Sequence, residues 1–409
     1  MSELPDAEIV IVGGGAIGCG VAYSLAKAGQ KDILLIERAA DVGQFTTAQG
    51  AGLCGQARSS VERIKLAMHS VATFRELQKD SEAPPDWREV GSLRIALNEK
   101  RAAEFRQLER ECVKASLEVA LVDNKEASRR WPPMKFEEAK AVLWCPSDGY
   151  MTPVRVAKAY EHQCRKMGVR FAMSTILKAI ECKAGQVEAV QTSRGRVNCK
   201  YVINAGGAHA YHIAKLVGLD LPIVPVRHEY FVTVPMDVLN PELPCFRIPE
   251  MTLYGRVRDG GLLLGGWEPT ALHTDPREYE LKGEPPQVET DWPVLSSFED
   301  KFRRIFPTAR PLEKKTVGKG WPTFTPDGRF IIGESSQVKG FVMAGGCNAH
   351  GISGSAGIGR LLVESLLDPK PSEYVRSLSP DRFAKSKWNW NEACRQAQRV
   401  YETYYGVEC

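Results

Sequence analysis

The sequence predicts an α/β fold in which a parallel sheet is assembled from separated segments of the chain. With it we expect an α+β region whose sheet is mostly antiparallel. The first observation is the apolar run Ile9–Val12, whose lack of alternation is typical of a strand buried on both faces. A second such run, residues 201–204, comes late in the chain and also leads into small residues. One sheet that takes strands from both places must have a second region built from the intervening segments.

Three glycines follow the first strand in the spacing Gly13-x-Gly15-x-x-Gly18. In such a strand-to-helix unit the first glycine allows a tight turn and the second lets the backbone approach a diphosphate. The third lets the helix pack closely on the strand. The diphosphate lies at the helix N-terminus, where free N–H groups and the dipole favour negative charge. We therefore expect a Rossmann-type dinucleotide site that includes Ala16 and Ile17.

A carboxylate follows the second strand of this unit. Apolar residues recur at helical spacing from Ile17 onward, and Gly29 ends the expected helix. The apolar run 33–36 is the second buried strand, and it ends in Glu37, about 20 residues past Gly18, where a carboxylate accepts hydrogen bonds from a ribose diol. A glycine-rich turn in another kind of sheet would not explain this position of Glu37.

The composition narrows the class of protein. The chain has 409 residues, 43% of them hydrophobic, and a formal net charge of +4, which suits two globular domains. It has no long Lys/Arg block and no apolar run of about 18 residues, so neither nucleic acid nor a membrane is an expected partner. The 11 cysteines include no Cys-x-x-Cys pair, so we expect free thiols and no metal site. Free thiols and a first strand too early to follow a signal peptide predict a cytoplasmic location.

Further elements follow from periodicity and from capping residues. Residues 46–53 form a glycine-rich loop that suits either a ligand contact or an ordinary flexible connection. Thr152 is the expected N-cap of a helix that has Pro153 at its first position. A strand crossing residues 247–254 and a long loop over 268–292 are expected in the inserted region. Helices are predicted over 60–79, 99–114, 355–367 and 388–405, and strands over 90–97, 169–173, 187–192, 230–234, 261–267, 326–333 and 340–346.

These residues resemble the D-amino-acid-oxidase-type FAD-dependent oxidoreductase superfamily. Within it the chain is similar to the flavin domains of dimethylglycine and sarcosine dehydrogenases and their oxidase relatives. The resemblance covers nearly the whole chain. Its motifs are Gly13-x-Gly15-x-x-Gly18 with Glu37, Thr46-Thr47 with Gly52-Leu53, Asn204-Ala205-Gly206, Pro225-Val-Arg-His228-Glu-Tyr230, Thr325-Pro-Asp327-Gly and His350-Gly351-Ile352.

The resemblance implies FAD as the cofactor and assigns residues to it. Arg38 and Leu177 would lie near the adenine, and the segment from Thr46 to Leu53 would pass the diphosphate and the flavin. Backbone N–H groups near the flavin would stabilise negative charge on the reduced ring. The implied cofactor residues are Gly13, Gly15, Ala16, Ile17, Gly18, Glu37, Arg38, Thr46, Thr47, Gln49, Gly52, Leu53, Leu177, Ala205, Gly206, Gly346, His350, Gly351 and Ile352.

The chain departs from its relatives in two places where flavin is attached covalently. The dehydrogenases attach flavin to a His in the early loop, where this chain has Gln49, and the monomeric sarcosine oxidases use a Cys near residues 321–324, which here read Trp-Pro-Thr-Phe. We therefore expect non-covalent FAD. The tyrosines Tyr401, Tyr404 and Tyr405 resemble the place where the mammalian-type enzymes pass into their folate-binding region. Because the sequence stops there, we expect coupling to tetrahydrofolate to be absent from this polypeptide.

The family chemistry implies oxidation of a secondary or tertiary amine, such as an N-methyl amino acid or a cyclic imino acid. The amine reacts in its neutral form, so we expect an apolar pocket over the flavin. The candidate catalytic residues are His228, Tyr254 and His350, each of which also suits a structural role. Arg227, Arg247, Arg256 and Arg329 are the alternatives for binding a substrate carboxylate.

The expected domains follow the same resemblance. Residues 1–85, 145–218 and 320–375 would form the FAD-binding domain, residues 86–144 and 219–319 the substrate domain, and residues 376–409 a helical tail. The expected partners are a small-molecule amine and either dioxygen or an electron-transfer partner, and a homo-oligomer is left open. Oxidation of a D-amino acid or a 2-hydroxy acid stays an alternative, as does a non-catalytic FAD-binding regulatory subunit.

Overall fold

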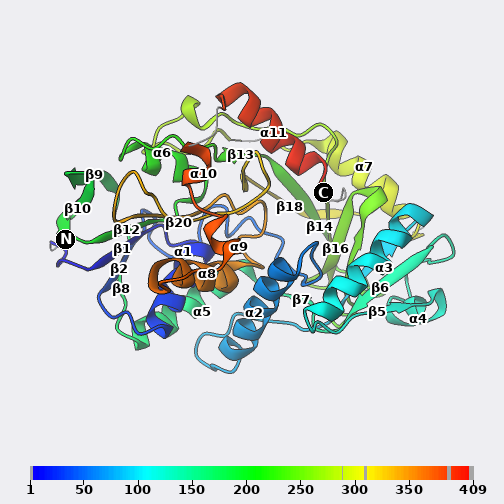
Figure 1. The fold of residues 1–409 in the computed structure, drawn as a ribbon. Coiled ribbons are helices and arrows are strands. Elements are labelled where there is room, and N and C mark those ends of the chain that lie inside the picture. The colour runs from blue at the N-terminus through cyan, green and yellow to red at the C-terminus, as the bar shows by residue number, and fades with distance from the viewer. Residues whose placement is uncertain (1–2, 288, 308–310, 385–387, 405–409) are drawn as a thin grey trace.

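The computed structural model describes residues 3–287, 289–307, 311–384 and 388–404. Its first layer is a six-stranded sheet whose strands come from both ends and the middle of the chain (Figure 1). All neighbouring strands pair in parallel except the first two, which are antiparallel. In spatial order the strands are β20 (Ile331–Glu334), β21 (Phe341–Gly345), β12 (Tyr201–Asn204), β1 (Ile9–Val12), β2 (Ile33–Ile36) and β8 (Arg170–Ala172).

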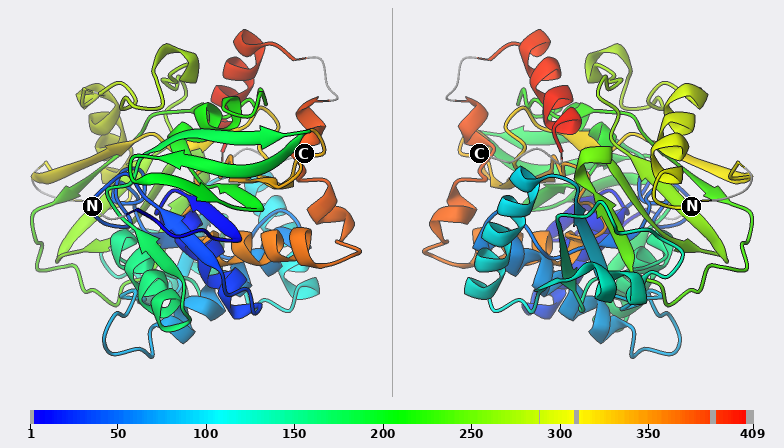
Figure 2. Two further views of the ribbon diagram at one scale, coloured as in Figure 1. Left: turned by 90° about the vertical axis from the view of Figure 1, so that its left-hand side faces the viewer. Right: turned by 90° about the vertical axis from the view of Figure 1, so that its right-hand side faces the viewer.

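Both faces of this sheet are covered, as the unbroken apolar runs require. Ile9 and Ile11 pack toward the helices α1 (Ala16–Lys27), α5 (Pro153–Lys166) and α8 (Ser355–Leu367). The alternate residues Val10 and Val12 pack toward the other face. That face is covered by α6 (Ala210–Lys215) and by a three-stranded sheet of β9 (Leu177–Lys183), β10 (Gln186–Thr192) and β11 (Gly195–Asn198). The left view of Figure 2 shows green strands of the middle of the chain beside the blue strands β1 and β2 of the six-stranded sheet.

A second, eight-stranded sheet lies beside the first layer and is antiparallel except where β15 meets β4 (Figure 1). Helix α7 (Trp292–Arg303) packs on it through Phe298 and Phe302. Its strands are, in spatial order, β18 (Lys314–Gly320), β14 (His228–Thr233), β17 (Gly261–Gly266), β16 (Leu253–Arg258), β15 (Cys245–Ile248), β4 (Ser92–Ala96), β6 (Ala141–Cys145) and β5 (Ala120–Val122). The predicted fold class is confirmed, while the domain boundaries stay a prediction.

The remaining elements join these layers. Strand β3 (Leu53–Cys54) pairs with β7 (Gly149–Tyr150), and β13 (Val224–Pro225) pairs with β19 (Thr323–Phe324). Helix α11 (Trp390–Glu402) lies at the top of the molecule in Figure 1, and its C-terminal end comes close to β14. The other helices are α2 (Val61–Leu77), α3 (Glu99–Lys114), α4 (Asn124–Arg130), α9 (Glu373–Arg376) and α10 (Asp381–Ala384). Within the described ranges, no helix combines the length and the apolar character needed to cross a membrane.

Several local predictions were wrong in detail. The expected strand over 247–254 is interrupted by a turn at Pro249–Met251, which Thr252 closes with a φ of 57°. The helix that begins at Trp292 was missed, although Asp291 caps it through the backbone N–H of Val294. Thr152 occupies the N-cap position of α5, but its hydroxyl donates to Asp86 instead of capping the helix.

The C-terminal helix, predicted over 388–405, spans Trp390–Glu402. Residues 385–387 and 405–409 of the predicted tail lie outside the described residues, and Tyr405 is among them.

Candidate functional site

The glycines of the first turn are required by close backbone contacts. Gly13 has a φ of 111°, and a Cβ atom there would lie 2.6 Å from the carbonyl oxygen of Ala205. A Cβ atom on Gly18 would lie 1.8 Å from the carbonyl oxygen of Gly13, far inside van der Waals contact. Helix α1 therefore packs directly on the turn, which leaves its N-terminus facing a cavity.

Glu37 stands at the end of β2, where two backbone groups orient its carboxylate. The N–H of Gly14 donates to Oε2 over 2.6 Å, and the N–H of Ala39 donates to Oε1 over 2.7 Å. Each oxygen keeps lone pairs that these bonds do not use. The side chain is buried yet lines a cavity, so the remaining lone pairs suit the hydroxyl groups of a bound ligand.

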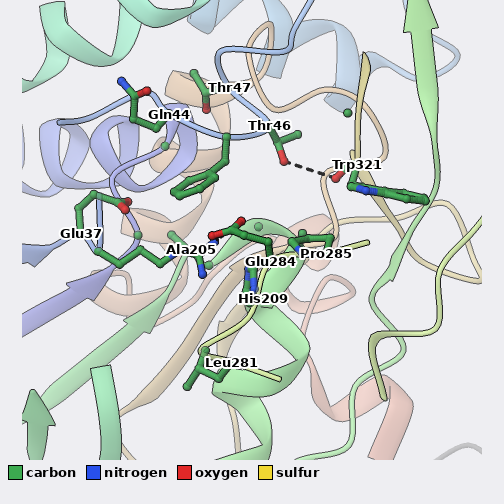
Figure 3. Close-up of a pocket in the computed structure, with 18 of the residues that line it drawn as sticks. Glu37, Gln44, Thr46, Thr47, Ala205, His209, Leu281, Glu284, Pro285 and Trp321 are labelled. Atoms are coloured by element: carbon green, nitrogen blue, oxygen red, sulfur yellow. Dashed lines mark hydrogen bonds and ion pairs between the residues drawn. The ribbon is translucent and has the colours of Figure 1, made fainter. Parts of the chain in front are cut away.

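A cavity of about 560 Å³ extends from Glu37 along the turn (Figure 3). Arg38 lines it and stacks on Phe45, 4.4 Å from the ring centroid. Thr47 accepts a hydrogen bond from the N–H of Ala16 at the start of α1, and this first helical turn carries no acidic residue. The helix end is therefore open to an anionic group.

The segment around residues 281–286 forms one wall of this cavity (Figure 3). Three side chains hold its backbone: His209 bonds the carbonyl of Gly283 over 2.8 Å, Arg38 donates to the same oxygen, and Trp321 donates to that of Pro286 over 2.9 Å. Burial lowers the pKa of His209 to about 4. The imidazole is therefore neutral at pH 7, and its Nε2–H donates to Gly283.

A second cavity of about 200 Å³ continues from the first, and its walls are mostly apolar. Gly15, Thr46, Thr47, Gln49 and Ala205 line both cavities, so the two form one elongated space. The lining of this second cavity includes Gly351 and Ile352 from the loop before α8, together with side chains from the eight-stranded sheet and from the residue after β17. Those side chains include His228, Tyr254 and Trp267.

His228 stands in a buried chain of hydrogen bonds. Its Nε2 lies 2.6 Å from the hydroxyl of Tyr254, and its Nδ1 lies 3.1 Å from that of Tyr401, which donates to the Glu268 carboxylate. Because the proton of Tyr401 points to Glu268, its oxygen accepts from Nδ1–H of His228. We therefore assign the unprotonated Nε2 as the acceptor from Tyr254. Burial lowers the pKa of His228 to about 3, so the ring is neutral at pH 7.

His350 is buried in a strained loop. Its Nδ1 lies 2.7 Å from the carbonyl oxygen of Asn348, and its Nε2 lies 3.1 Å from the hydroxyl of Tyr404. Asn348 and Ala349 have φ values of 44° and 60°, conformations that cost free energy in residues other than glycine. Burial, with Arg58 and other nearby cations, lowers the pKa of His350 well below its usual value.

Most predicted site residues lie on the walls of this joined space. The larger cavity is lined by Gly13, Gly15, Glu37, Arg38, Thr46, Thr47, Gln49, Leu177, Ala205 and Gly206. The smaller one is lined by Gly15, Ala16, Ile17, Thr46, Thr47, Gln49, Gly52, Leu53, Ala205, His228, Tyr254, Gly351 and Ile352. Gly18 and Gly346 are not on either wall, and His350 lines a third, neighbouring cavity.

The four arginines proposed for a substrate carboxylate differ in position. Arg247 lines the smaller cavity. Arg227 is paired with Glu268 and Asp291. Arg256 donates to backbone carbonyls, and Arg329 donates to the hydroxyl of Ser377. Of the four, only Arg247 lines that cavity.

Sequence reasoning missed several residues at the apolar end. Tyr401 and Tyr404 come from the C-terminal helix and the turn after it, and Glu268 and Trp267 follow β17. The ring of Tyr404 stacks on that of Trp267 with centroids 3.8 Å apart. The only signal was the tyrosine pattern near the C-terminus, which by itself says nothing about a contact with residue 228.

Comparison with known proteins identifies the family. The profile of DAO, described as FAD dependent oxidoreductase, matches residues 8–365. The chain belongs to this family.

Its relatives include enzymes and a regulatory subunit. The chain is 27% identical over 406 residues to mitochondrial dimethylglycine dehydrogenase of Rattus norvegicus, covering 97% of this chain and 47% of that protein. It is 28% identical over 384 residues to the mitochondrial pyruvate dehydrogenase phosphatase regulatory subunit of Mus musculus, covering 92% of this chain and 43% of that protein. The chain thus spans less than half of either relative.

Among solved structures, L-proline dehydrogenase from P. horikoshii matches with a TM-score of 0.84 at 22% identity. The match covers 95% of this chain and 100% of that one, and it shows a shared fold.

The joined space fits the cofactor of the FAD-dependent family. Its polar end, with the Glu37 carboxylate, suits a nucleoside, and the open N-terminus of α1 suits a diphosphate. Its apolar end suits a flat ring.

Proposed function

We propose that this chain oxidises a secondary or tertiary amine, an N-methyl amino acid or a cyclic imino acid, with FAD as the electron acceptor. The observation that carries the proposal is the Tyr254–His228 pair on the wall of the apolar cavity, facing the Gly351–Ile352 loop. The similarity to dimethylglycine dehydrogenase supports the same substrate class.

In this proposal FAD is held non-covalently along the joined space. Glu37 would accept from the ribose, Gly15 and the start of α1 would receive the diphosphate, and Arg38 and Leu177, which line the larger cavity, would lie by the adenine. Gly351 and Ile352 lie by the flavin. Bound FAD supplies the acceptor for a hydride equivalent from the carbon next to the amine nitrogen, and the imine product then hydrolyses.

The hydrogen-bond chain orients the substrate amine in its neutral form. Tyr254 donates its proton to Nε2 of the neutral His228, so the lone pairs of the Tyr254 oxygen accept an N–H of the amine. The His228 ring is held by its Nδ1–H on Tyr401, whose hydroxyl donates to the Glu268 carboxylate. Because burial lowers the pKa of His228 to about 3, the ring stays neutral, and the apolar cavity favours the neutral amine over the ammonium.

Anaerobic reduction tests this function. The purified yellow protein is mixed without oxygen with N-methyl amino acids, cyclic imino acids, D-amino acids and 2-hydroxy acids, and bleaching of the flavin is followed. We expect bleaching by the first two classes, and bleaching by D-amino acids or hydroxy acids alone would contradict the proposal. Admission of air then shows whether dioxygen or another acceptor reoxidises the flavin. Colour that stays in the acid-precipitated pellet would contradict non-covalent binding.

A second candidate is a non-catalytic role, favoured by the similarity to the pyruvate dehydrogenase phosphatase regulatory subunit. In that case FAD stabilises the fold, and a partner enzyme binds to the protein surface. Protein that holds FAD but is bleached by no amine, amino acid or hydroxy acid supports this candidate.

A further inference from the structure

A third cavity of about 290 Å³ adjoins the apolar end of the proposed flavin site. Arg58, Arg247 and Tyr404 line both this cavity and the smaller one described above, so these three side chains stand at the junction. The third cavity extends from the junction toward α2 and α3. Five arginines line it: Arg58, Arg63, Arg94, Arg101 and Arg247.

Two carboxylates share the lining, and both are engaged by other groups. Glu104 lies 2.7 Å from Arg101, and Glu111 lies 2.8 Å from Lys114 while accepting from Gln107. Neither of these contacts involves the arginines at the junction. Among the described residues, the lining therefore has more arginines than carboxylates, and we call this third cavity the basic cavity.

The arginines repel one another. The pKa of Arg58 is lowered to about 10, first by its burial and then by Arg247, with Arg94 and Arg63 adding to the effect. Like charges held together in a partly buried cavity cost free energy that a bound anion offsets. Guanidinium groups are also the side chains best suited to paired hydrogen bonds with a carboxylate.

We infer that the amine substrate carries a second anionic group, which lies in the basic cavity while the reacting nitrogen lies at Tyr254. This inference rests on the proposed function and narrows its substrate class to amines with two acidic groups. One carboxylate lies at the junction beside Arg58 and Arg247, and the distal one lies deeper, beside Arg63 and Arg101. Phe105 and Leu108 supply apolar wall for the hydrocarbon between them.

Calorimetric titration of the FAD-loaded protein tests the subsite without catalysis. The probes are glutarate and adipate, each compared with its own monoamide, which keeps the shape and removes one charge. We expect a dissociation constant about tenfold lower for at least one diacid than for its monoamide, since a charge-assisted pair contributes at least that much. Equal constants for every diacid and its monoamide would overturn the inference.

Anaerobic flavin reduction provides the second arm. N-methylglutamate is compared with N-methylglutamine, which differs only at the distal group, and a higher ratio of rate to half-saturating concentration is expected for the diacid. Arg63→Gln should remove this preference by lowering the value for N-methylglutamate much more than the value for N-methylglutamine. Arg101→Gln is a second variant should the first unfold. Arg106→Gln is the matched control, because Arg106 is exposed on α3, the helix that carries Arg101, and lies outside the cavity lining.

The two arms separate the two failures. A flavin that no amine reduces, in a protein that still prefers diacids, contradicts the proposed function while retaining the anion subsite. Reduction by N-methyl amino acids with no preference for a second charge, in wild type and variants alike, supports the proposed function and overturns the subsite.

Discussion

The Glu37 end of the joined cavity takes most of its motif from one short stretch, whereas the His228 end gathers side chains from distant parts of the chain. Residues 13–37 supply the turn, the helix and the carboxylate, and local backbone geometry requires each glycine that matters. At the other end the wall comes from β14, β16, the segment after β17 and the turn after α11. Cofactor binding thus depends on backbone fit, and the proposed chemistry depends on side chains held by tertiary contacts.

The largest expected effect separates chemistry from cofactor binding. His228→Ala should slow flavin reduction by about 10²–10⁴-fold, because Tyr254 loses the acceptor for its proton. The ratio of FAD to protein should not change, since His228 lines the joined cavity only at its apolar end, away from the proposed nucleoside and diphosphate sites. Stopped-flow absorbance measures the rate, and Tyr211→Phe, which alters a buried tyrosine packed on Trp390, is the control. Reduction at the wild-type rate would remove His228 from the mechanism.

The converse variant acts on the other end. Gly18→Ala places a Cβ atom 1.8 Å from a backbone oxygen, so α1 must shift. We expect a loss of roughly 2–4 kcal/mol in the free energy of unfolding and loss of bound FAD. Chemical denaturation and flavin absorbance measure both.

Gly351→Ala is the matched control for the stability measurement only, made on protein without FAD, because a Cβ atom at Gly351 meets no protein atom within 4 Å while the residue lines the proposed flavin site. Equal stability and FAD content in wild type and Gly18→Ala would show that the close packing is not required.

Acid should lower the free energy of unfolding through His209, which holds one wall of the larger cavity. The pKa of His209 is about 4 in the folded protein and about 6.5 in the unfolded chain, so the unfolded state binds the proton first. Stability from this group is therefore full above pH 6.5 and falls as the pH drops toward 4. His209→Gln should reduce the loss between pH 7 and pH 5 by about 1–2 kcal/mol. Urea unfolding at both pH values measures this, and an unchanged loss would contradict the assignment of His209 as a buried neutral donor.

The smallest effect, on the rate of FAD release, is expected for Arg38, which lines the larger cavity. Arg38 stacks on Phe45 and pairs with Glu284, whose side chain is largely exposed. Because exposed ion pairs contribute about 0–1 kcal/mol, Arg38→Ala should raise the rate of FAD release by no more than about fivefold. Fluorescence of the released flavin follows this step. A hundredfold faster release would mean that Arg38 holds the cofactor directly.

The two ends also differ in how far the sequence predicts them. Strand, glycine turn, helix and Glu37 follow from residues that are neighbours in the chain, and the structure forms them over nearly the predicted bounds. The helices Glu99–Lys114 and Ser355–Leu367 likewise match their predicted ranges, because amphipathic periodicity is a local signal. Family resemblance supplied His228 and Tyr254, which composition and spacing alone would not have selected.

The rest depended on tertiary contacts with no local signal. The bond between His228 and Tyr401 joins residues 173 positions apart. The hydroxyl of Thr152 was expected to cap its own helix by accepting from a backbone N–H, yet it makes no such bond and instead donates to Asp86 in another segment. The basic cavity brings together arginines from α2, β4, α3 and β15, which are unremarkable one by one in the sequence.

The most direct test is the structure of the FAD-loaded protein at a resolution that shows the flavin ring. The account predicts the diphosphate at the N-terminus of α1 and the ring between Gly351–Ile352 and the Tyr254–His228 wall. A ring that lies away from Tyr254, or a diphosphate away from α1, would contradict it.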